Sequence, residues 1–235
     1  MSSEDRTVSQ TADSTEDAQP QPAAGTEDGR PEAAAGTEEG RPEAAPGTEE
    51  GRPEAAPGTY LPGDLDREAR LARMLRVDHA GEYGARRIYE GQLAVLGRSA
   101  AGPTIRHMHE QEAKHLETFE RLIVENRVRP TALQPVWHVA GFALGAATAL
   151  MGEKAAMACT VAVEEVIDEH YARQAEQLED DQAELKETIE TFRAEELEHR
   201  DIGLEHGAEE TAGYEALSGA IKAGSRLAIW LSERF

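Results

Sequence analysis

The chain has 235 residues and a formal net charge of −22 at pH 7, and 30% of its residues are charged. This length allows one sizeable domain with additional segments, and the negative charge argues against nucleic acid as a partner, because a phosphate backbone needs a basic surface. A single cysteine, Cys159, excludes an internal disulfide and a zinc site built from cysteines. Its small apolar neighbours predict a buried thiol.

Residues 1–60 are predicted to form a disordered tail, because 1–59 hold fourteen Asp and Glu, four Arg and almost no large apolar residue. An eleven-residue unit that begins G-T-E recurs from Gly25, Gly36 and Gly47, and its glycines and prolines break helices, so we interpret it as a linker. The tail lacks both the apolar stretch and the acid-poor composition of targeting peptides. This favours a bacterial chain that is not exported.

Residues 61–235 are predicted to form one domain that is helical almost throughout. Alternating strand patterns are absent from it, and Glu, Ala, Leu and Arg dominate. Glycine, proline or polar turn residues separate the helical segments. An antiparallel all-α bundle is therefore expected, with helices near 65–97, 101–127, 133–151, 154–178, 182–208 and 213–233.

The segment 136–163 contains two apolar runs, separated by Gly152, Glu153 and Lys154. Neither run reaches the roughly eighteen to twenty residues that a membrane-spanning helix requires. Two interpretations stay open. The segment is either a hairpin buried between the bundle helices, or an apolar surface that lies in a membrane interface with Trp137 at the level of the headgroups.

Two E-x-x-H motifs interrupt apolar helical stripes. On 101–127 the stripe steps by three and four through Ile105, Met108, Glu112, His115 and Phe119. On 182–208 the equivalent stripe is Ile189, Phe192, Glu196 and His199. A buried carboxylate without a partner is very costly, so these positions favour a metal site.

Two further glutamates, Glu82 and Glu164, occupy core positions on the helices that precede the two motifs. The chain thus has the pattern Glu…E-x-x-H twice, which is the ligand set of ferritin-like di-iron and di-manganese bundles. Carboxylates and imidazoles without thiolates suit iron or manganese better than structural zinc. The alternative is that the six residues are solvated helix residues and satisfied core histidines, in a helical interaction module without metal.

Several runs resemble the demethoxyubiquinone hydroxylase family of quinone biosynthesis over roughly 70–235. They are D-H-A-G-E-Y-G-A-R-R-I-Y (78–89), F-A-L-G-A-A-T-A-L-M-G (142–152), A-M-A-C-T-V-A-V-E-E (156–165), E-E-L-E-H-R-D-I-G-L (195–204) and the C-terminal L-S-E-R-F. The resemblance implies a ferritin-like four-helix bundle with an additional apolar hairpin and a C-terminal helix. It implies O₂-dependent hydroxylation of a polyprenyl demethoxy-quinol at a centre of two iron ions. An iron-storage or peroxide-removing ferritin-like protein is the alternative function.

By this resemblance Glu112 and Glu196 bridge the two irons, one of which is also held by Glu82 and His115, and the other by Glu164 and His199. Asp78 and Asp201 are candidates to orient the ligands, while Glu195 and Glu198 are expected to face solvent. Tyr171 and His170 are candidate catalytic residues at the quinol pocket.

The membrane-resident quinol implied by the resemblance favours membrane docking of 136–163. We expect peripheral attachment to the cytoplasmic side of a bacterial inner membrane, with other quinone-biosynthesis proteins as further candidate partners.

Overall fold

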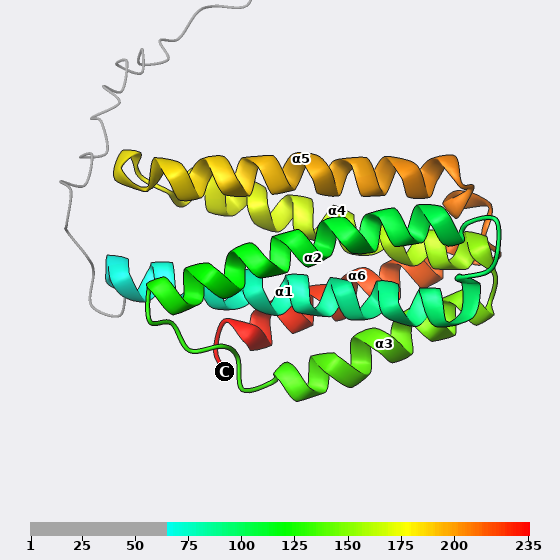
Figure 1. Cartoon of the computed structure of the whole chain (residues 1–235), viewed down its shortest axis with the longest axis horizontal. Helices are drawn as coiled ribbons and strands as arrows, with labels where there is room; N and C mark the ends of the chain where they lie inside the picture. Colours follow the sequence, from blue (N-terminus) through cyan, green and yellow to red (C-terminus); the bar gives the residue numbers. More distant parts are fainter. Residues whose placement is uncertain (1–64) are drawn as a thin grey trace, which may run out of the picture. The chain divides into compact units, whose positions relative to one another are not determined.

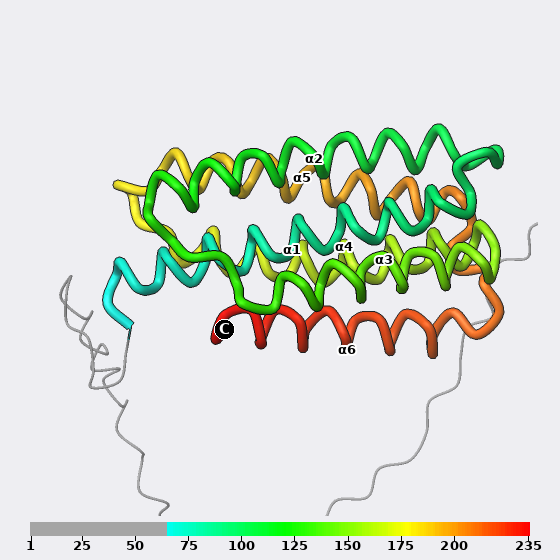
Figure 2. The backbone as a smooth tube through the Cα atoms, turned by 60° about the horizontal axis from the view of Figure 1, so that its bottom comes forward, coloured from blue at the N-terminus to red at the C-terminus, as the bar shows by residue number. Residues whose placement is uncertain are grey.

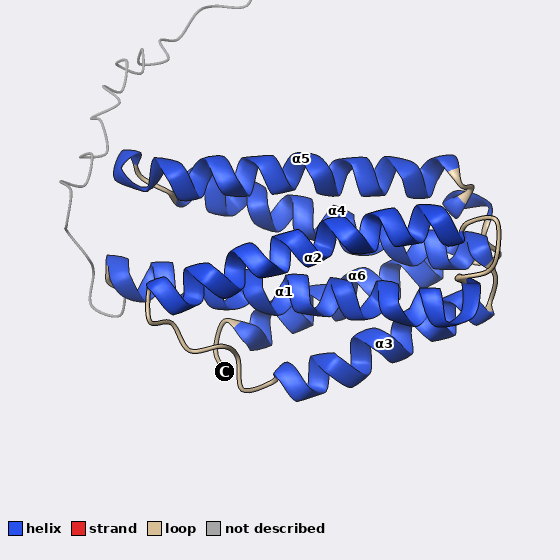
Figure 3. Ribbon diagram, in the orientation of Figure 1, coloured by secondary structure: helices blue, strands red, loops and turns tan. Residues whose placement is uncertain are grey.

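A computed structural model describes residues 65–235, and these residues are helical nearly throughout (Figures 1 and 3). The α-helices are α1 (Arg67–Leu96), α2 (Gly102–Glu125), α3 (Gln134–Leu150), α4 (Glu153–Gln177), α5 (Ala183–Glu205) and α6 (Tyr214–Ser232). Short 3₁₀ turns, η1 (Asp180–Gln182) and η2 (Ala208–Glu210), flank α5. The expected all-α fold is confirmed, and each helix lies close to its predicted range. The predicted tail at 1–60 lies outside the described residues.

Local chemistry sets the helix ends. Asp66 caps α1, because its side chain accepts a hydrogen bond from the Ala69 amide at 2.8 Å. The helix α5 ends at Glu205, earlier than predicted, because Gly207 adopts a left-handed conformation with φ of 78°. A 3₁₀ turn, η2, follows this glycine and leads toward α6.

The helices form layers. The pairs α1 with α2 and α4 with α5 pack together, and hydrogen bonds join α1 to α4 and α2 to α5, which closes a four-helix bundle. On the other side of α1 and α4, α3 packs on α1 and α6 packs on α4. Figure 2 shows α2 and α5 on one side of α1 and α4, and α6 on the opposite side. The predicted ferritin-like bundle with an added hairpin helix and a C-terminal helix is therefore confirmed.

Two apolar clusters fill the bundle. One contains Leu75, Phe119 and Ile189, and the other contains Ile105, Met108 and Val161. Along each of the four helices the predicted polar residues fall between the two clusters. Dry packing on both sides therefore surrounds a polar centre.

Glycines bring α3 unusually close to α1. A Cβ atom at Gly145 would lie 1.9 Å from the Ile88 carbonyl oxygen, and one at Gly91 would lie 2.2 Å from the Phe142 carbonyl oxygen. Both neighbours are backbone atoms, which cannot rotate away. The two helices approach so closely at these positions that only glycine fits there.

We expect Gly145→Ala to lower the free energy of unfolding by about 1–3 kcal/mol, because the added methyl group forces α3 away from α1. The midpoint of urea unfolding measures this change. The matched control is Gly219→Ala on α6, where a Cβ atom would have nothing within 4 Å in the described part of the chain, and there alanine should leave stability unchanged or raise it. Equal stability of the two variants would contradict the close packing of α3 on α1.

Part of the apolar segment 136–163 is buried, as a hairpin inside the bundle would be, and part of it is an exposed apolar surface. Residues 155–163 are buried at the start of α4, and Cys159 is fully buried as expected. The helix α3 instead exposes large apolar side chains, among them Val136 and Val139. Trp137 is partly buried, and its indole N–H donates to the Ser232 hydroxyl at 3.0 Å, while Trp230 is 50% exposed. The position of Trp137 at the level of the headgroups stays a prediction. Between residues 65 and 235, no helix combines the length and hydrophobicity needed to cross a membrane.

Candidate metal centre

The structure brings all six predicted ligands together in the middle of the four-helix bundle. Their potential ligand atoms form two groups, within each of which every atom lies within 4.8 Å of the others. Glu112 and Glu196 belong to both groups. The first group is completed by Glu82 and His115, and the second by Glu164 and His199. This is the grouping that the family resemblance implies, while the binding of metal stays a prediction.

The Nδ1 atoms of both histidines face the carboxylates. His115 Nδ1 lies 3.1 Å from Glu196 Oε1 and 3.4 Å from Glu82 Oε2. His199 Nδ1 lies 3.2 Å from both Glu112 Oε1 and Glu196 Oε2. Glu196 thus lies between the two imidazoles, one oxygen toward each. A residue that reaches both groups in this way has the position of a bridging ligand.

The donor set fits metal ions. All six side chains are buried to 1% exposure or less. Within residues 65–235, neither oxygen of Glu112 has a hydrogen-bond partner, and Glu164 Oε2 also has none. Buried carboxylate oxygens without donors are costly, and iron and manganese accept such oxygens together with imidazole nitrogen. The centre therefore has the chemistry of a site for two metal ions.

The buried carboxylates and imidazoles of the centre shift one another's pKa values. Burial raises the pKa of Glu112 well above its usual range, and the neighbouring Glu196 raises it further. Burial disfavours the charged form of His115, but hydrogen bonds to Glu196 and Glu82 outweigh it and raise the pKa of His115 to about 12. Burial also favours neutral Glu196, but His115 and His199 outweigh it and lower the pKa of Glu196 to about 2. The two histidines thus favour the charged form of Glu196, the carboxylate that lies between them.

Two tyrosines donate hydrogen bonds to Glu82 and Glu164, the outer glutamates, each of which belongs to only one ligand group. The Tyr171 hydroxyl donates to Glu82 Oε1, and the Tyr89 hydroxyl donates to Glu164 Oε1 at 2.8 Å. Burial, together with the nearby glutamates, raises the pKa of both tyrosines well above the usual range, so both remain donors. Each tyrosine follows a ligand glutamate by seven residues and binds the glutamate of the other helix. Tyr89 was not among the predicted site residues, and its repeat of the Glu164 to Tyr171 spacing is the sequence signal that identifies it.

Asp78 does not orient a ligand histidine, so this prediction is wrong. Its Oδ1 atom lies 3.1 Å from His170 Nε2 and accepts a hydrogen bond from Gln174 Nε2 at 2.7 Å. The helices α1 and α4 run antiparallel, so the turn before Glu82 on α1 faces the turn after Tyr171 on α4. Asp78 therefore contacts α4 rather than the motif helices.

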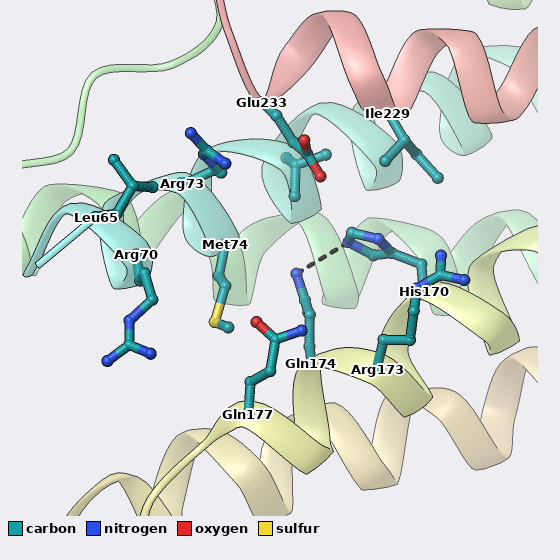
Figure 4. A pocket seen from close by; sticks show the side chains of 11 residues that line it. Leu65, Arg70, Arg73, Met74, His170, Arg173, Gln174, Gln177, Ile229 and Glu233 are labelled. Atoms are coloured by element: carbon teal, nitrogen blue, oxygen red, sulfur yellow. Dashed lines mark hydrogen bonds between the residues drawn. The ribbon is translucent and has the colours of Figure 1, made fainter. Parts of the chain in front are cut away.

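His170 and Gln174 line a polar cavity of about 590 Å³ (Figure 4). Figure 4 shows the hydrogen bond between these two side chains, with Arg73 of α1 and Arg173 of α4 also at the cavity wall. None of the six ligand residues lines this cavity. His170 thus belongs to a polar network beside the metal centre, and its catalytic role stays a prediction, as does that of Tyr171.

Two further expectations on α5 are wrong. Asp201 is 58% exposed and bonds to Arg200, because it lies two residues after His199 and hence more than half a turn round the helix. Glu195 does not simply face solvent, since its Oε2 atom lies 2.5 Å from His115 Nε2. Gln111 makes the corresponding contact, with its Oε1 atom 3.0 Å from His199 Nε2.

An apolar groove of about 550 Å³ lies on the other side of α1 and α4, covered by α3 and α6. Its floor includes Gly81 and Val163, which are the chain neighbours of Glu82 and Glu164. Val77 and Ile229 line both this groove and the polar cavity. An apolar molecule bound in the groove would therefore contact residues that are adjacent in sequence to two candidate metal ligands, Glu82 and Glu164.

Residues 69–232 match the family described as ubiquinone biosynthesis protein COQ7. A Rhodospirillum rubrum protein named 3-demethoxyubiquinol 3-hydroxylase is 62% identical over 175 residues, which cover 74% of this chain and 82% of that protein. A Homo sapiens protein named NADPH-dependent 3-demethoxyubiquinone 3-hydroxylase, mitochondrial, is 56% identical over 176 residues, or 72% and 81% of the two chains. The Saccharomyces cerevisiae 5-demethoxyubiquinone hydroxylase, mitochondrial, is 40% identical over 183 residues, or 71% and 78%. The chain therefore belongs to the COQ7 family of ubiquinone biosynthesis and is a hydroxylase.

Proposed function

We propose that the chain hydroxylates the ring of a polyprenyl demethoxy-quinol in ubiquinone biosynthesis, with O₂ as co-substrate and two iron ions as cofactor. The names of its relatives support the reaction class and the substrate. The observation that carries the proposal is the pair of buried ligand groups that share Glu112 and Glu196, next to the floor of an apolar groove.

In this chemistry the protein would hold the metal ions, orient their ligands and shield the reacting atoms from water. A bound pair of iron ions would supply the redox chemistry that activates O₂. Glu112 and Glu196 would hold both ions, while the Tyr89 and Tyr171 hydroxyls fix the orientation of the outer glutamates. Apolar packing on both sides of the centre keeps bulk water away from the reacting atoms.

The groove suits the substrate. Its lining is almost entirely apolar, and Gly81 and Gly84 leave open space above α1, where an added Cβ atom would have nothing of residues 65–235 within 4 Å. A prenyl chain requires such an apolar lining, and a flat ring requires the room left by the glycines. We therefore assign the ring to the part of the groove near Val163 and the prenyl chain to the part between α3 and α6.

Complementation of a bacterial strain that lacks its own hydroxylase tests the function. We expect the full chain to remove the accumulated demethoxy-quinone and to restore ubiquinone, as measured by mass spectrometry of extracted lipids. An iron-storage protein would instead take up many iron ions per chain and leave the quinones unchanged. Persistent demethoxy-quinone in a strain that produces the folded chain would exclude the proposed reaction.

We further propose that α3 and α6 attach the protein to the cytoplasmic side of a bacterial inner membrane, where its quinol substrate lies. Val136 and Val139 of α3, and Leu227 and Trp230 of α6, are half or more exposed, which is unusual for apolar residues that face water alone. Other proteins of quinone biosynthesis are further candidate partners of this surface.

We expect Leu227→Glu to weaken binding to vesicles of phosphatidylethanolamine and phosphatidylglycerol about tenfold or more. It removes an apolar side chain that is 56% exposed and adds a charge at the interface. Co-sedimentation measures the bound fraction. The control is Leu204→Glu on α5, in the layer away from α3 and α6. If both variants bind like the unmodified chain, membrane attachment through α6 is wrong.

A further inference from the structure

Each candidate ligand histidine has a second ring nitrogen with a defined partner. The Nδ1 atoms of His115 and His199 face the carboxylate cluster, so their Nε2 atoms point away from it. His115 Nε2 meets Glu195 Oε2 at 2.5 Å, and His199 Nε2 meets Gln111 Oε1 at 3.0 Å. With Nδ1 as the metal ligand, each Nε2–H donates to the oxygen of its partner.

These partners follow the repeated Glu…E-x-x-H pattern of the chain. Glu195 immediately precedes Glu196 in one motif, and Gln111 immediately precedes Glu112 in the other. Each of them binds the histidine of the opposite motif, because α2 and α5 run antiparallel. The two tyrosine–glutamate pairs between α1 and α4 repeat the same crossed arrangement.

The two halves differ in charge at this point. The partner of His115 is a carboxylate, and the partner of His199 is a neutral amide. A carboxylate that accepts the Nε2–H increases the electron density on Nδ1 and strengthens its bond to a metal. An amide oxygen fixes the orientation of the ring but gives a much weaker electronic effect. Phe192 additionally stacks on His115 at 4.0 Å between ring centroids, which limits rotation of that imidazole.

We propose that Glu195 and Gln111 are positioning residues that make the two metal positions unequal. The position of Glu82 and His115 binds its ion more tightly, and the position of Glu164 and His199 binds its ion more weakly. This inference rests on the proposed metal centre. It assigns a role to Glu195, although 38% of the Glu195 side chain is accessible to solvent.

Matched substitutions at the two positions separate the effects. Glu195→Gln gives both histidines an amide partner, and Gln111→Glu gives both a carboxylate. Anaerobic titration of the full chain with Co²⁺, followed by calorimetry and by visible absorption, measures each binding step without turnover. We expect the unmodified chain to bind two ions in two resolved steps. Glu195→Gln should weaken the tighter step about 10–100-fold, so that the two steps merge, while Gln111→Glu should tighten the weaker step.

Two controls make the outcome specific. Glu198→Gln removes a charge from an exposed position on the same helix and should leave both steps within about twofold, because screened surface charges act weakly. Glu195→Asp keeps the carboxylate and should restore part of the tighter step. Two steps unchanged in both Glu195→Gln and Gln111→Glu would overturn the inference and leave the metal centre intact. Absence of Co²⁺ binding by the unmodified chain would overturn the proposed function itself.

Discussion

Replacing Glu196 by glutamine is expected to reduce the iron content from about two ions per chain to almost none. Glu196 contributes to both ligand groups and lies between the two imidazoles. The amide keeps the shape of the side chain but removes the charge and one metal-binding oxygen. Hydroxylation should fall by at least about 1,000-fold, because the redox chemistry depends on the metal. Metal analysis of the purified protein and quinone analysis of the complemented strain measure the two effects.

Two further variants make this result interpretable. Glu198→Gln changes an exposed carboxylate two residues away and should retain full iron content. Glu164→Gln affects only one ligand group and keeps an oxygen that can accept from Tyr89, so about one ion should remain. Circular dichroism establishes that each variant is folded. A Glu196→Gln protein that retains both irons and full activity would show that Glu196 is not the bridging ligand.

Filling the apolar groove is the second change with a large expected effect. Ala228→Trp places a bulky ring in the groove between α3 and α6, where we assign the prenyl chain. We expect hydroxylation to fall by about 100-fold, because the displaced quinol ring no longer lies in reach of the centre. Iron content should remain unchanged, since Ala228 lies outside both ligand groups. Quinone analysis and metal analysis of the same variant separate loss of substrate from loss of metal.

The control for the groove is Ala216→Trp. Ala216 is exposed on the same helix and does not line the groove, so a tryptophan there should leave hydroxylation nearly unchanged. Equal activity of Ala228→Trp and the unmodified chain would place the substrate elsewhere, and the polar cavity beside His170 would then be the next region to test.

Helical periodicity predicted the fold and the six clustered residues, because both depend on the angle at which residues leave a helix. Glu112 and Glu196 lie in phase with the apolar residues of α2 and α5, so burial of those residues also buries the glutamates. The same reasoning rejects Asp201, whose two-residue offset from His199 turns it outward. Closeness in sequence to His199 wrongly suggested a contact for Asp201, whereas its angular position on the helix predicts that it faces outward.

Contacts between helices could not be predicted in this way. Glu195 lies beside the inward face of α5, and only the lateral distance to α2 decides whether it reaches His115. Asp78 shares the phase of Glu82, but the axial offset between α1 and α4 places it against His170. Such offsets depend on how two helices pack against each other, and the pattern of a single helix does not contain them.

The crossed tyrosine–glutamate pairs have a consequence for the geometry of the centre. The Tyr89 and Tyr171 hydroxyls each link α1 to α4 at the height of the centre. The spacing of these two helices is thus set by the chain itself, which keeps Glu82 and Glu164 apart at a fixed separation. The outer glutamates of the proposed iron site would therefore be positioned by bonds within the chain, and not by the ions alone.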